Sequence, residues 1–142
     1  MTYTELTATE DVAAALQEYA AAWTALDLQR VADQWDRQDP EVTYIAEELG
    51  EVLVGPERIS EHLLRTEHRI SASSVSLRDV HVRELAPGLA LATFICRWEF
   101  EWVTYSRVSA LLRRRDMRWL FTHYMEAPFH MEDWDSRAER DR

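Results

Sequence analysis

The sequence predicts an α+β domain in which three short helices precede a bent, mostly antiparallel sheet. Apolar residues recur at helical spacing in the first half of the chain, and from about residue 75 they follow the period of extended strands. The chain has 142 residues, the length of one domain, and 46% of them are hydrophobic, enough to form a core. We expect a single domain over residues 1–130 and a charged tail over residues 131–142.

Helical spacing of apolar residues predicts three helices, each with a recognisable start or face. The first covers residues 10–26. The second is short and follows Asp27, because an aspartate there can accept a hydrogen bond from a free backbone N–H of the first turn. The third begins at Pro56, since proline is tolerated in a first turn, and runs to about Arg69. The apolar face of the first helix consists of Val12, Leu16, Tyr19, Trp23 and Leu26.

Extended segments fill the rest of the chain. Two short strands are expected before the third helix, and four long strands after it. Their ranges are 42–46, 52–54, 75–85, 89–102, 104–114 and 118–126. In the first long strand Val75 and Leu77 have the opposite parity to Val80 and Val82. This change of parity predicts a β-bulge near Asp79.

The long strands carry apolar residues at both parities, although antiparallel sheets commonly have one face in water. Three short helices can cover only one face of the sheet. We therefore expect a homodimer through the convex face, because lasting interfaces bury large apolar areas and concentrate aromatic residues. The residues expected near the centre of this interface are Trp98, Trp119, Phe121 and His123.

The charge of the chain excludes two classes of partner. The formal net charge is -10, and an acidic chain repels both the phosphate backbone of nucleic acids and anionic membrane surfaces. No apolar stretch approaches the length of a membrane span, and the acidic start of the sequence has no apolar signal core. The one cysteine, Cys96, fits a reducing compartment, so we expect a cytoplasmic protein.

Composition also excludes several kinds of chemistry. All 16 basic residues are arginine, so a catalytic lysine is ruled out. Only 3 glycines are present, and neither of the glycine-rich motifs that cradle nucleotide phosphates occurs. No His or Cys cluster has the spacing of metal ligands, because His62 and His68 are six residues apart on one helix. We expect neither a cofactor nor a metal.

Two segments of the sequence follow a known family pattern. They are residues 52–63, VLVGPERISEHL, and the closing run Arg107-x-Ser109, Arg114, Asp116, Trp119 and His123-Tyr124-Met125-Glu126-Ala127-Pro128. The closing run resembles the SnoaL-like branch of the nuclear transport factor 2-like superfamily, whose last strand commonly reads W-x-x-x-H-Y-x-E-S/A-P. The resemblance covers roughly residues 9–128. It implies a cone-shaped α+β barrel, in a superfamily that includes isomerases, dehydratases, cyclases, epoxide hydrolases, assembly domains and transport factors.

A second resemblance concerns residues 16–35, LQEYAAAWTALDLQRVADQW, which are similar to the helical start of the ketosteroid isomerases. It implies that Tyr19 is the tyrosine that donates a hydrogen bond to a dienolate oxygen. The alternative is that Tyr19 and Trp23 only pack the core. The chain departs from these isomerases at Ala46, where they have the base, and at Ser109 or Ala110, where they have a second acid.

Acidic residues near two strand ends are candidates for general acid or base. Burial there raises the pKa of a carboxyl toward the useful range. Glu48 shares the strand parity of Tyr44, so we expect Glu48 rather than Glu47 to enter the pocket. Glu126 is the last residue of the last strand, on a face that the family resemblance implies is inward. The alternatives are that Glu47 and Glu48 are solvated and that Glu126 forms a structural ion pair with Arg97.

These observations favour a cofactor-independent enzyme that uses acid–base chemistry on a small hydrophobic organic molecule. Isomerisation, cyclisation, dehydration and hydrolysis need the same groups. The alternative is a non-catalytic ligand-binding or assembly domain of the same fold. The predicted catalytic residues are Tyr19, Glu48 and Glu126, and the predicted substrate-binding residues are Trp23, Tyr44, Glu47, His62, Arg97 and Tyr124. Because a working base is partly desolvated, Gln in place of Glu48 or Glu126 is expected to preserve or raise stability.

Overall fold

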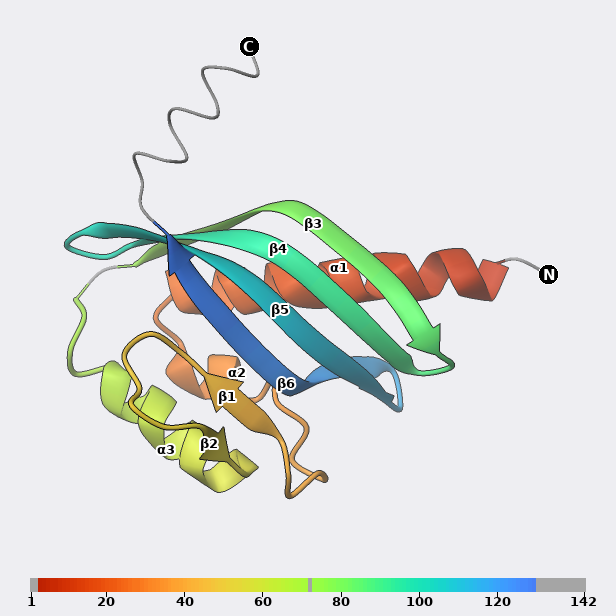
Figure 1. Ribbon diagram of the computed structural model, residues 1–142, viewed down its shortest axis with the longest axis horizontal. Coiled ribbons are helices and arrows are strands. Elements are labelled where there is room, and N and C mark those ends of the chain that lie inside the picture. The colour runs from red at the N-terminus through yellow and green to blue at the C-terminus, as the bar shows by residue number, and fades with distance from the viewer. Residues whose placement is uncertain (1–2, 72, 130–142) are drawn as a thin grey trace, which may run out of the picture.

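The computed structural model describes residues 3–71 and 73–129 and confirms the α+β fold (Figure 1). Within these residues the chain forms three helices and six strands, which are α1 (Tyr3–Thr24), α2 (Leu28–Ala32), β1 (Thr43–Ile45), β2 (Leu53–Val54), α3 (Pro56–Thr66), β3 (Ser74–Ala86), β4 (Leu89–Glu99), β5 (Val103–Arg115) and β6 (Arg118–Phe129). The first helix begins at Tyr3 rather than at residue 10. The expected tail, 131–142, lies outside the described residues.

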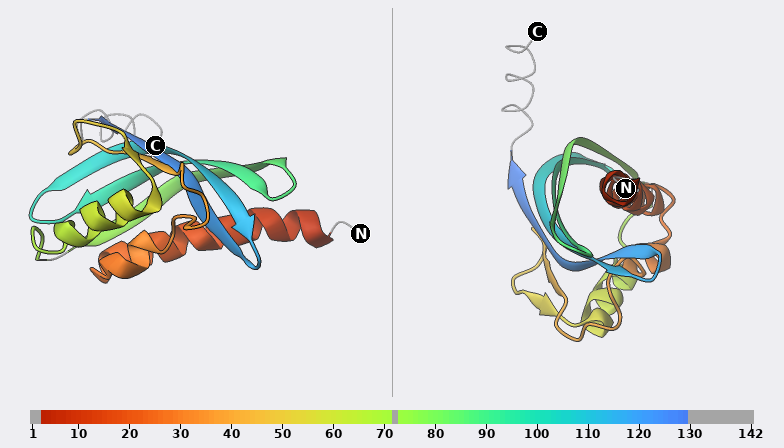
Figure 2. Two further views of the ribbon diagram at one scale, coloured as in Figure 1. Left: turned by 90° about the horizontal axis from the view of Figure 1, so that it is seen from below. Right: turned by 90° about the vertical axis from the view of Figure 1, so that its right-hand side faces the viewer.

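The strands form one six-stranded sheet in the order β2-β1-β6-β5-β4-β3. Neighbouring strands are antiparallel, except that β1 runs parallel to β6. Figure 2 shows the sheet curling around α1, while α2 and α3 lie together near β1 and β2. The long strands and the helices thus enclose a cone whose inner face carries the core.

Local features expected from the sequence are present at their positions. The Asp27 carboxylate accepts a hydrogen bond from the backbone N–H of Arg30 at 3.2 Å and caps α2. Gly55 precedes α3 with a φ of 99°, a conformation that residues with a side chain rarely adopt. The predicted bulge in β3 is confirmed, because the register shifts between Arg78 and His81 and Asp79 has a φ of 55°.

A second bulge, in β6, is not apparent in the sequence. Phe121 pairs with Leu112, but His123 pairs with the preceding residue Leu111, so Thr122 is an extra residue in the strand. The inward-facing positions therefore change from odd to even numbers at Thr122. Trp119 and Phe121 before the bulge and Tyr124 after it therefore belong to the same core.

This bulge corrects the expected centre of the dimer interface. Trp119 and Phe121 are buried within the single chain, at 5% and 1% exposure. Trp98, at 8%, faces the inside of the cone from β4. None of these three rings is available to a partner on the convex face, so their placement in the interface was wrong. His123 is partly exposed and lies beyond the bulge on the outer side.

The centre of the cone is filled by five aromatic rings, which we call the aromatic cluster. It consists of Tyr19, Trp35, Tyr44, Phe121 and Tyr124, none more than 2% exposed. Contacting rings have centroids 5.0 to 6.2 Å apart, mostly edge to face or tilted. Such pairs stabilise a core by about 0.5–1.5 kcal/mol each beyond the burial of their area. The cluster joins α1, the segment after α2, β1 and β6.

An ion pair to β5 and two backbone hydrogen bonds to β6 fix the segment after α2 against the sheet. Backbone hydrogen bonds run from Phe121 N–H to the Gln34 carbonyl at 2.7 Å and from Asp36 N–H to the Phe121 carbonyl at 2.9 Å. The Asp36 side chain is 1% exposed and accepts hydrogen bonds from Arg115 Nε at 2.9 Å and from the N–H of Gln38 at 3.0 Å. These contacts hold Trp35 in the aromatic cluster.

Replacing Asp36 with alanine is expected to lower the free energy of unfolding by about 2–3 kcal/mol, because a charged, fully buried acceptor of two hydrogen bonds is lost. Chemical denaturation measures the change. Glu51→Ala is the matched control, because Glu51 pairs with Arg58 at the surface and its loss is expected to leave stability near that of the wild type. Equal effects of the two substitutions would contradict the role given to Asp36.

Candidate functional site

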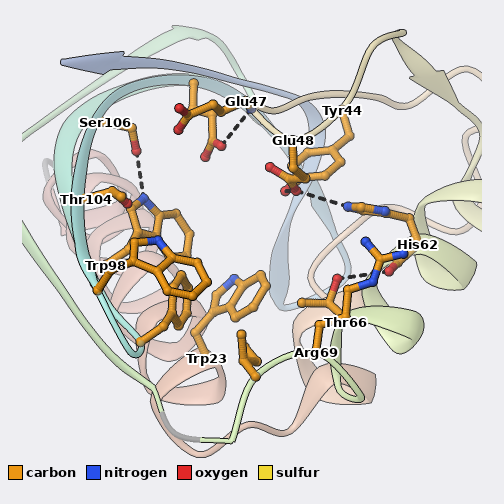
Figure 3. A pocket seen from close by; sticks show the side chains of 14 residues that line it. Trp23, Tyr44, Glu47, Glu48, His62, Thr66, Arg69, Trp98, Thr104 and Ser106 are labelled. Atoms are coloured by element: carbon orange, nitrogen blue, oxygen red, sulfur yellow. Dashed lines mark hydrogen bonds and ion pairs between the residues drawn. The ribbon is translucent and has the colours of Figure 1, made fainter.

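A pocket of about 420 Å³ opens beyond the aromatic cluster at one end of the cone (Figure 3). Its size lies in the range of small-molecule sites, about 300–1,000 Å³. It is lined by Trp23, Tyr44, Glu47, Glu48, His62, Thr66, Arg69, Ile70, Trp98, Phe100, Trp102, Thr104, Ser106 and Glu126. The pocket therefore combines an aromatic wall with a group of acidic side chains.

Segments distant in the sequence contribute these side chains. Trp23 lies near the end of α1, and His62 and Thr66 lie on one side of α3. The turn after β1 brings Glu47 and Glu48, and β6 brings Glu126. The aromatic wall comes from the end of β4 and the turn that follows it. The curvature of the sheet is what makes these elements converge.

Glu48 and His62 form a hydrogen-bonded pair in the pocket. His62 Nε2 lies 3.0 Å from Glu48 Oε1, and the Tyr44 hydroxyl donates to the same oxygen at 3.5 Å. Burial by itself raises the pKa of the Glu48 carboxyl, but the hydrogen bonds from His62, the backbone and Tyr44 favour the charged form more strongly. The pKa of Glu48 is therefore below its ordinary value, and Glu48 is ionised at neutral pH.

Glu126 has the opposite electrostatic environment. Its Oε1 accepts a hydrogen bond from the backbone N–H of Glu47 at 3.2 Å. Burial, followed by the negative charges of Glu48 and Glu47, raises the pKa of the Glu126 carboxyl to about 7, and the Glu47 N–H offsets this only in part. Glu126 is therefore divided between its protonated and charged forms near neutral pH.

The aromatic wall is rigidly packed. Trp23 meets Trp98 edge to face with centroids 5.3 Å apart, and Phe100 stacks on Trp98 at 6.1 Å. Trp98 Nε1 donates a hydrogen bond to Ser106 Oγ at 2.7 Å. Trp102 contacts Phe100 and is 54% exposed, so it extends the wall toward solvent. This wall suits the apolar body of an organic ligand.

The structure brings most of the predicted site residues together. Those in the pocket are Trp23, Tyr44, Glu47, Glu48, His62 and Glu126. The expectation that only one of the adjacent glutamates would enter was wrong. Strand alternation does not apply to Glu47 and Glu48, because β1 ends at Ile45 and both residues lie in the turn that follows.

Three predicted residues do not line the pocket. Tyr19 and Tyr124 are 0% exposed within the aromatic cluster, and burial raises the pKa of both hydroxyls well above the usual value. Direct donation from Tyr19 to a ligand has no support in this arrangement. Arg97 lies on the outer parity of β4, with Nη1 3.3 Å from Glu99 Oε2. The alternative of an Arg97–Glu126 ion pair is therefore not supported.

Several pocket residues were missed by the sequence analysis. They are Thr66, Arg69, Ile70, Trp98, Phe100, Trp102, Thr104 and Ser106. One usable signal was the i, i+4 spacing of His62 and Thr66, which places them on one helical face, whereas Arg69 lies in the turn after α3. The others depend on how far the ends of β4 and β5 curl over the pocket, and a single sequence gives little indication of that curvature.

The fold and the sequence together identify the family. The model of the SnoaL-like domain family matches residues 12–129, so the chain belongs to this family, within the nuclear transport factor 2-like superfamily. No curated protein sequence gives a significant match. In the described part of the chain no helix is long and apolar enough to cross a membrane. Among the same residues, no three His, Cys, Asp or Glu side chains are grouped to hold a metal ion.

Solved structures share the fold at low sequence identity. A candidate scytalone dehydratase from Novosphingobium aromaticivorans has a TM-score of 0.79 and 13% identity, covering 92% of this chain and 89% of its own. A candidate dehydratase of the NTF2-like family from Streptomyces avermitilis has a TM-score of 0.78 and 18% identity, covering 87% and 97%. A candidate calcium/calmodulin-dependent protein kinase II association domain from Xanthomonas campestris has a TM-score of 0.68 and 17% identity, covering 84% and 86%.

The two glutamates are expected to respond oppositely to replacement by glutamine. Because the pKa of Glu126 is raised from 4.5 to about 7, the folded state binds more protons than the unfolded state between these values, and stability falls as pH rises through this window. Glu126→Gln is therefore expected to stabilise the protein by about 1–2 kcal/mol above this window and to have little effect below it.

Glu48→Gln is the comparison. The lowered pKa of Glu48 means that its charge stabilises the fold, so this substitution is expected to cost up to ~1 kcal/mol at neutral pH, contrary to the sequence-based expectation. Denaturation curves of both variants across this pH range measure the effects. A destabilising Glu126→Gln at high pH would show that the carboxyl is not held in an unfavourable charged state.

Proposed function

We propose that this protein is a SnoaL-like enzyme that performs cofactor-independent acid–base chemistry on a small hydrophobic organic molecule bound in the pocket. The observation that carries this proposal is Glu126, a carboxyl with a pKa of about 7 in an aromatic-walled pocket. A group whose pKa lies near the working pH can accept and release protons efficiently. Isomerisation, cyclisation, dehydration and hydrolysis all use such a group.

In this proposal Glu126 carries the proton and Glu48 sets the conditions for it. The charge of Glu48, fixed by His62 and Tyr44, helps to keep the pKa of Glu126 high. The aromatic wall binds the apolar part of the ligand and displaces water, which strengthens electrostatic interactions in the pocket. Two proteins of similar fold bear dehydratase names, so dehydration is the first of the four reactions to test.

The alternative is a non-catalytic ligand-binding or assembly domain, and the similar fold of the candidate association domain favours it. In that case neither the pocket nor Glu126 has a catalytic role. This alternative predicts a cone whose centre is filled by aromatic rings, and the aromatic cluster does fill it. The open pocket above the cluster, with two donors on Glu48, favours the enzyme instead.

The base-promoted ring opening of 5-nitrobenzisoxazole tests the proposal without knowledge of the natural substrate, because a desolvated carboxylate removes its proton. The rate is expected to rise with pH through about 7, as Glu126 ionises. Glu126→Gln is expected to lower the rate by about 100-fold, and Glu51→Gln, on a surface acid outside the pocket, to leave it unchanged. Equal rates for wild type and Glu126→Gln would overturn the assignment of Glu126.

We also propose that the protein is a cytoplasmic homodimer, with the convex face of the sheet as the interface. The corrected register leaves Leu91, Ile95, Leu111 and Met125 on the outer face, each partly or largely exposed. Leu91 and Leu111 are direct cross-strand partners, and Met125 lies one strand further, opposite Ser109. These exposed apolar side chains support association more plainly than the buried aromatic rings first expected there.

Leu111→Glu is expected to convert the dimer to monomers, because a charge beside Leu91 on this face must be desolvated on association. Sedimentation at micromolar concentration measures the change. Val52→Glu is the control, since Val52 is 46% exposed but lies outside the long strands. A monomeric wild type would contradict the proposed dimer.

A further inference from the structure

Two aromatic rings meet at a steep angle where the wall of the pocket reaches solvent. Phe100 and Trp102 lie in the turn between β4 and β5, and the Phe100 N–H donates to the Trp102 carbonyl at 2.8 Å. Their ring planes meet at 65° with centroids 5.7 Å apart. Phe100 is partly exposed and Trp102 is 54% exposed, so both rings have surface that a ligand can contact. We call this pair of rings the aromatic corner.

The carboxyls of the same pocket carry negative charge that the protein does not compensate. Glu48 is engaged by His62, but neither Glu47 nor Glu126 forms an ion pair among the residues that the structure describes. Arg69 also lines the pocket, yet it makes no ion pair with these acids in the described part of the chain. Mutual repulsion of the acids is one cause of the raised pKa of Glu126. The pocket therefore lacks a counterion.

The rings and the acids border one open volume of about 420 Å³, and Figure 3 shows Glu47 and Glu48 across the open space from Trp23. Electron-rich ring faces attract a cation within about 6 Å, and carboxylates attract it over longer distances. A neutral apolar ligand uses the rings but not the acids. A hydrated inorganic cation uses the acids but not the rings. An organic cation uses both.

We propose that the pocket binds a hydrophobic organic cation, a protonated or quaternary amine, whose nitrogen lies between the aromatic corner and the carboxyls of Glu47 and Glu126. The methyl or methylene groups on the nitrogen share its positive charge and contact the rings. The inference rests on the proposed function only in that the pocket binds an organic molecule, and it names the class of that molecule. A cation beside Glu126 also favours the charged form, which is the form that accepts a proton.

Arg69 is the competing cation within the protein. Its side chain is exposed at the edge of the pocket, in the turn after α3. Arg69→Gln is expected to strengthen the binding of a cation about three-fold, because a positive charge near the acids is removed. Weaker cation binding by this variant would count against the inference.

The first experiment compares two probes of the same shape. They are 4-(trimethylammonio)benzyl alcohol and 4-tert-butylbenzyl alcohol, in which a positively charged nitrogen replaces a carbon atom. Isothermal titration calorimetry of the whole chain at a pH near 7 measures both affinities. The cation is expected to bind about ten-fold more tightly than the neutral alcohol, although the alcohol is the more hydrophobic of the two.

Proton release is a second readout of the same titrations. Near its pKa of about 7, Glu126 is roughly half protonated, and a cation beside it favours the loss of that proton. Binding of the cation is therefore expected to release up to about half a proton, measured from the dependence of the heat on the buffer. The neutral alcohol is expected to release none, and Glu126→Gln to abolish the release.

Variants separate the acids from the rings. Glu47→Gln is expected to weaken cation binding about five-fold and to leave binding of the neutral alcohol unchanged. Glu51→Gln, which changes the net charge equally but lies outside the pocket, is expected to affect neither probe. Trp102→Leu keeps an apolar side chain at an exposed position, and it is expected to weaken cation binding about three-fold more than binding of the alcohol.

Three results would overturn the inference. They are a neutral alcohol that binds as tightly as its cationic counterpart, equal effects of Glu47→Gln and Glu51→Gln on the cation, and an absence of binding by either probe. If the cation binds as expected while 5-nitrobenzisoxazole shows no dependence on Glu126, the cation site stands and the acid–base proposal fails. If the reaction depends on Glu126 but the neutral alcohol binds better, the acid–base proposal stands and the cation site fails.

Discussion

Tyr19 of α1 meets Phe121 and Tyr124 of β6 at centroid distances of 5.1 and 5.5 Å, and Trp35 and Tyr44 complete the aromatic cluster around them. These contacts set the distance between the long helix and the sheet. They also fill the centre of the cone completely, so a ligand can enter only beyond them. Of the five rings only Tyr44 also lines the pocket, so the cluster borders the pocket through this residue.

The bulge at Thr122 connects the aromatic cluster to the chemistry of the pocket. With regular alternation after Phe121, the inward side chains would have been His123 and Met125. The extra residue turns Tyr124 into the cluster, paired across from Ala110, and Glu126 into the pocket wall. One irregularity in the register thus supplies a ring to the core and a carboxyl to the site. Bulges are frequent beside functional sites for this reason.

Much of the fold could be predicted from the sequence because its signals are local. Asp27 and Pro56 mark helix starts by their own chemistry, and the parity change at Asp79 shows directly as a displaced apolar pattern. The bulge at Thr122 gave no such signal, since apolar residues stand on both sides of it and either parity looks buried. The misplacement of Trp119 and Phe121 in the dimer interface follows from this one ambiguity.

The candidate site was predictable in part for a similar reason. Glu48 and Glu126 lie close to the predicted ends of strands, where the chain is expected to leave the core. The partner of Glu48 was not predictable, because His62 reaches it from α3 only through the tertiary fold. Likewise, Tyr19 is excluded from the pocket by packing among aromatic rings from four separate segments. The residue spacing within one helix cannot predict that packing.

The pocket holds two ionisable carboxyls whose pKa values move in opposite directions. Glu48 receives donors from His62 and Tyr44, and these outweigh its burial. Glu126 receives a single backbone N–H and is exposed to the charge of Glu48, so burial prevails. A pair of acids separated in this way can have one permanent charge and one exchangeable proton at the same pH. The donors on Glu48 and the deeper burial of Glu126 together determine which acid keeps its charge and which holds the exchangeable proton.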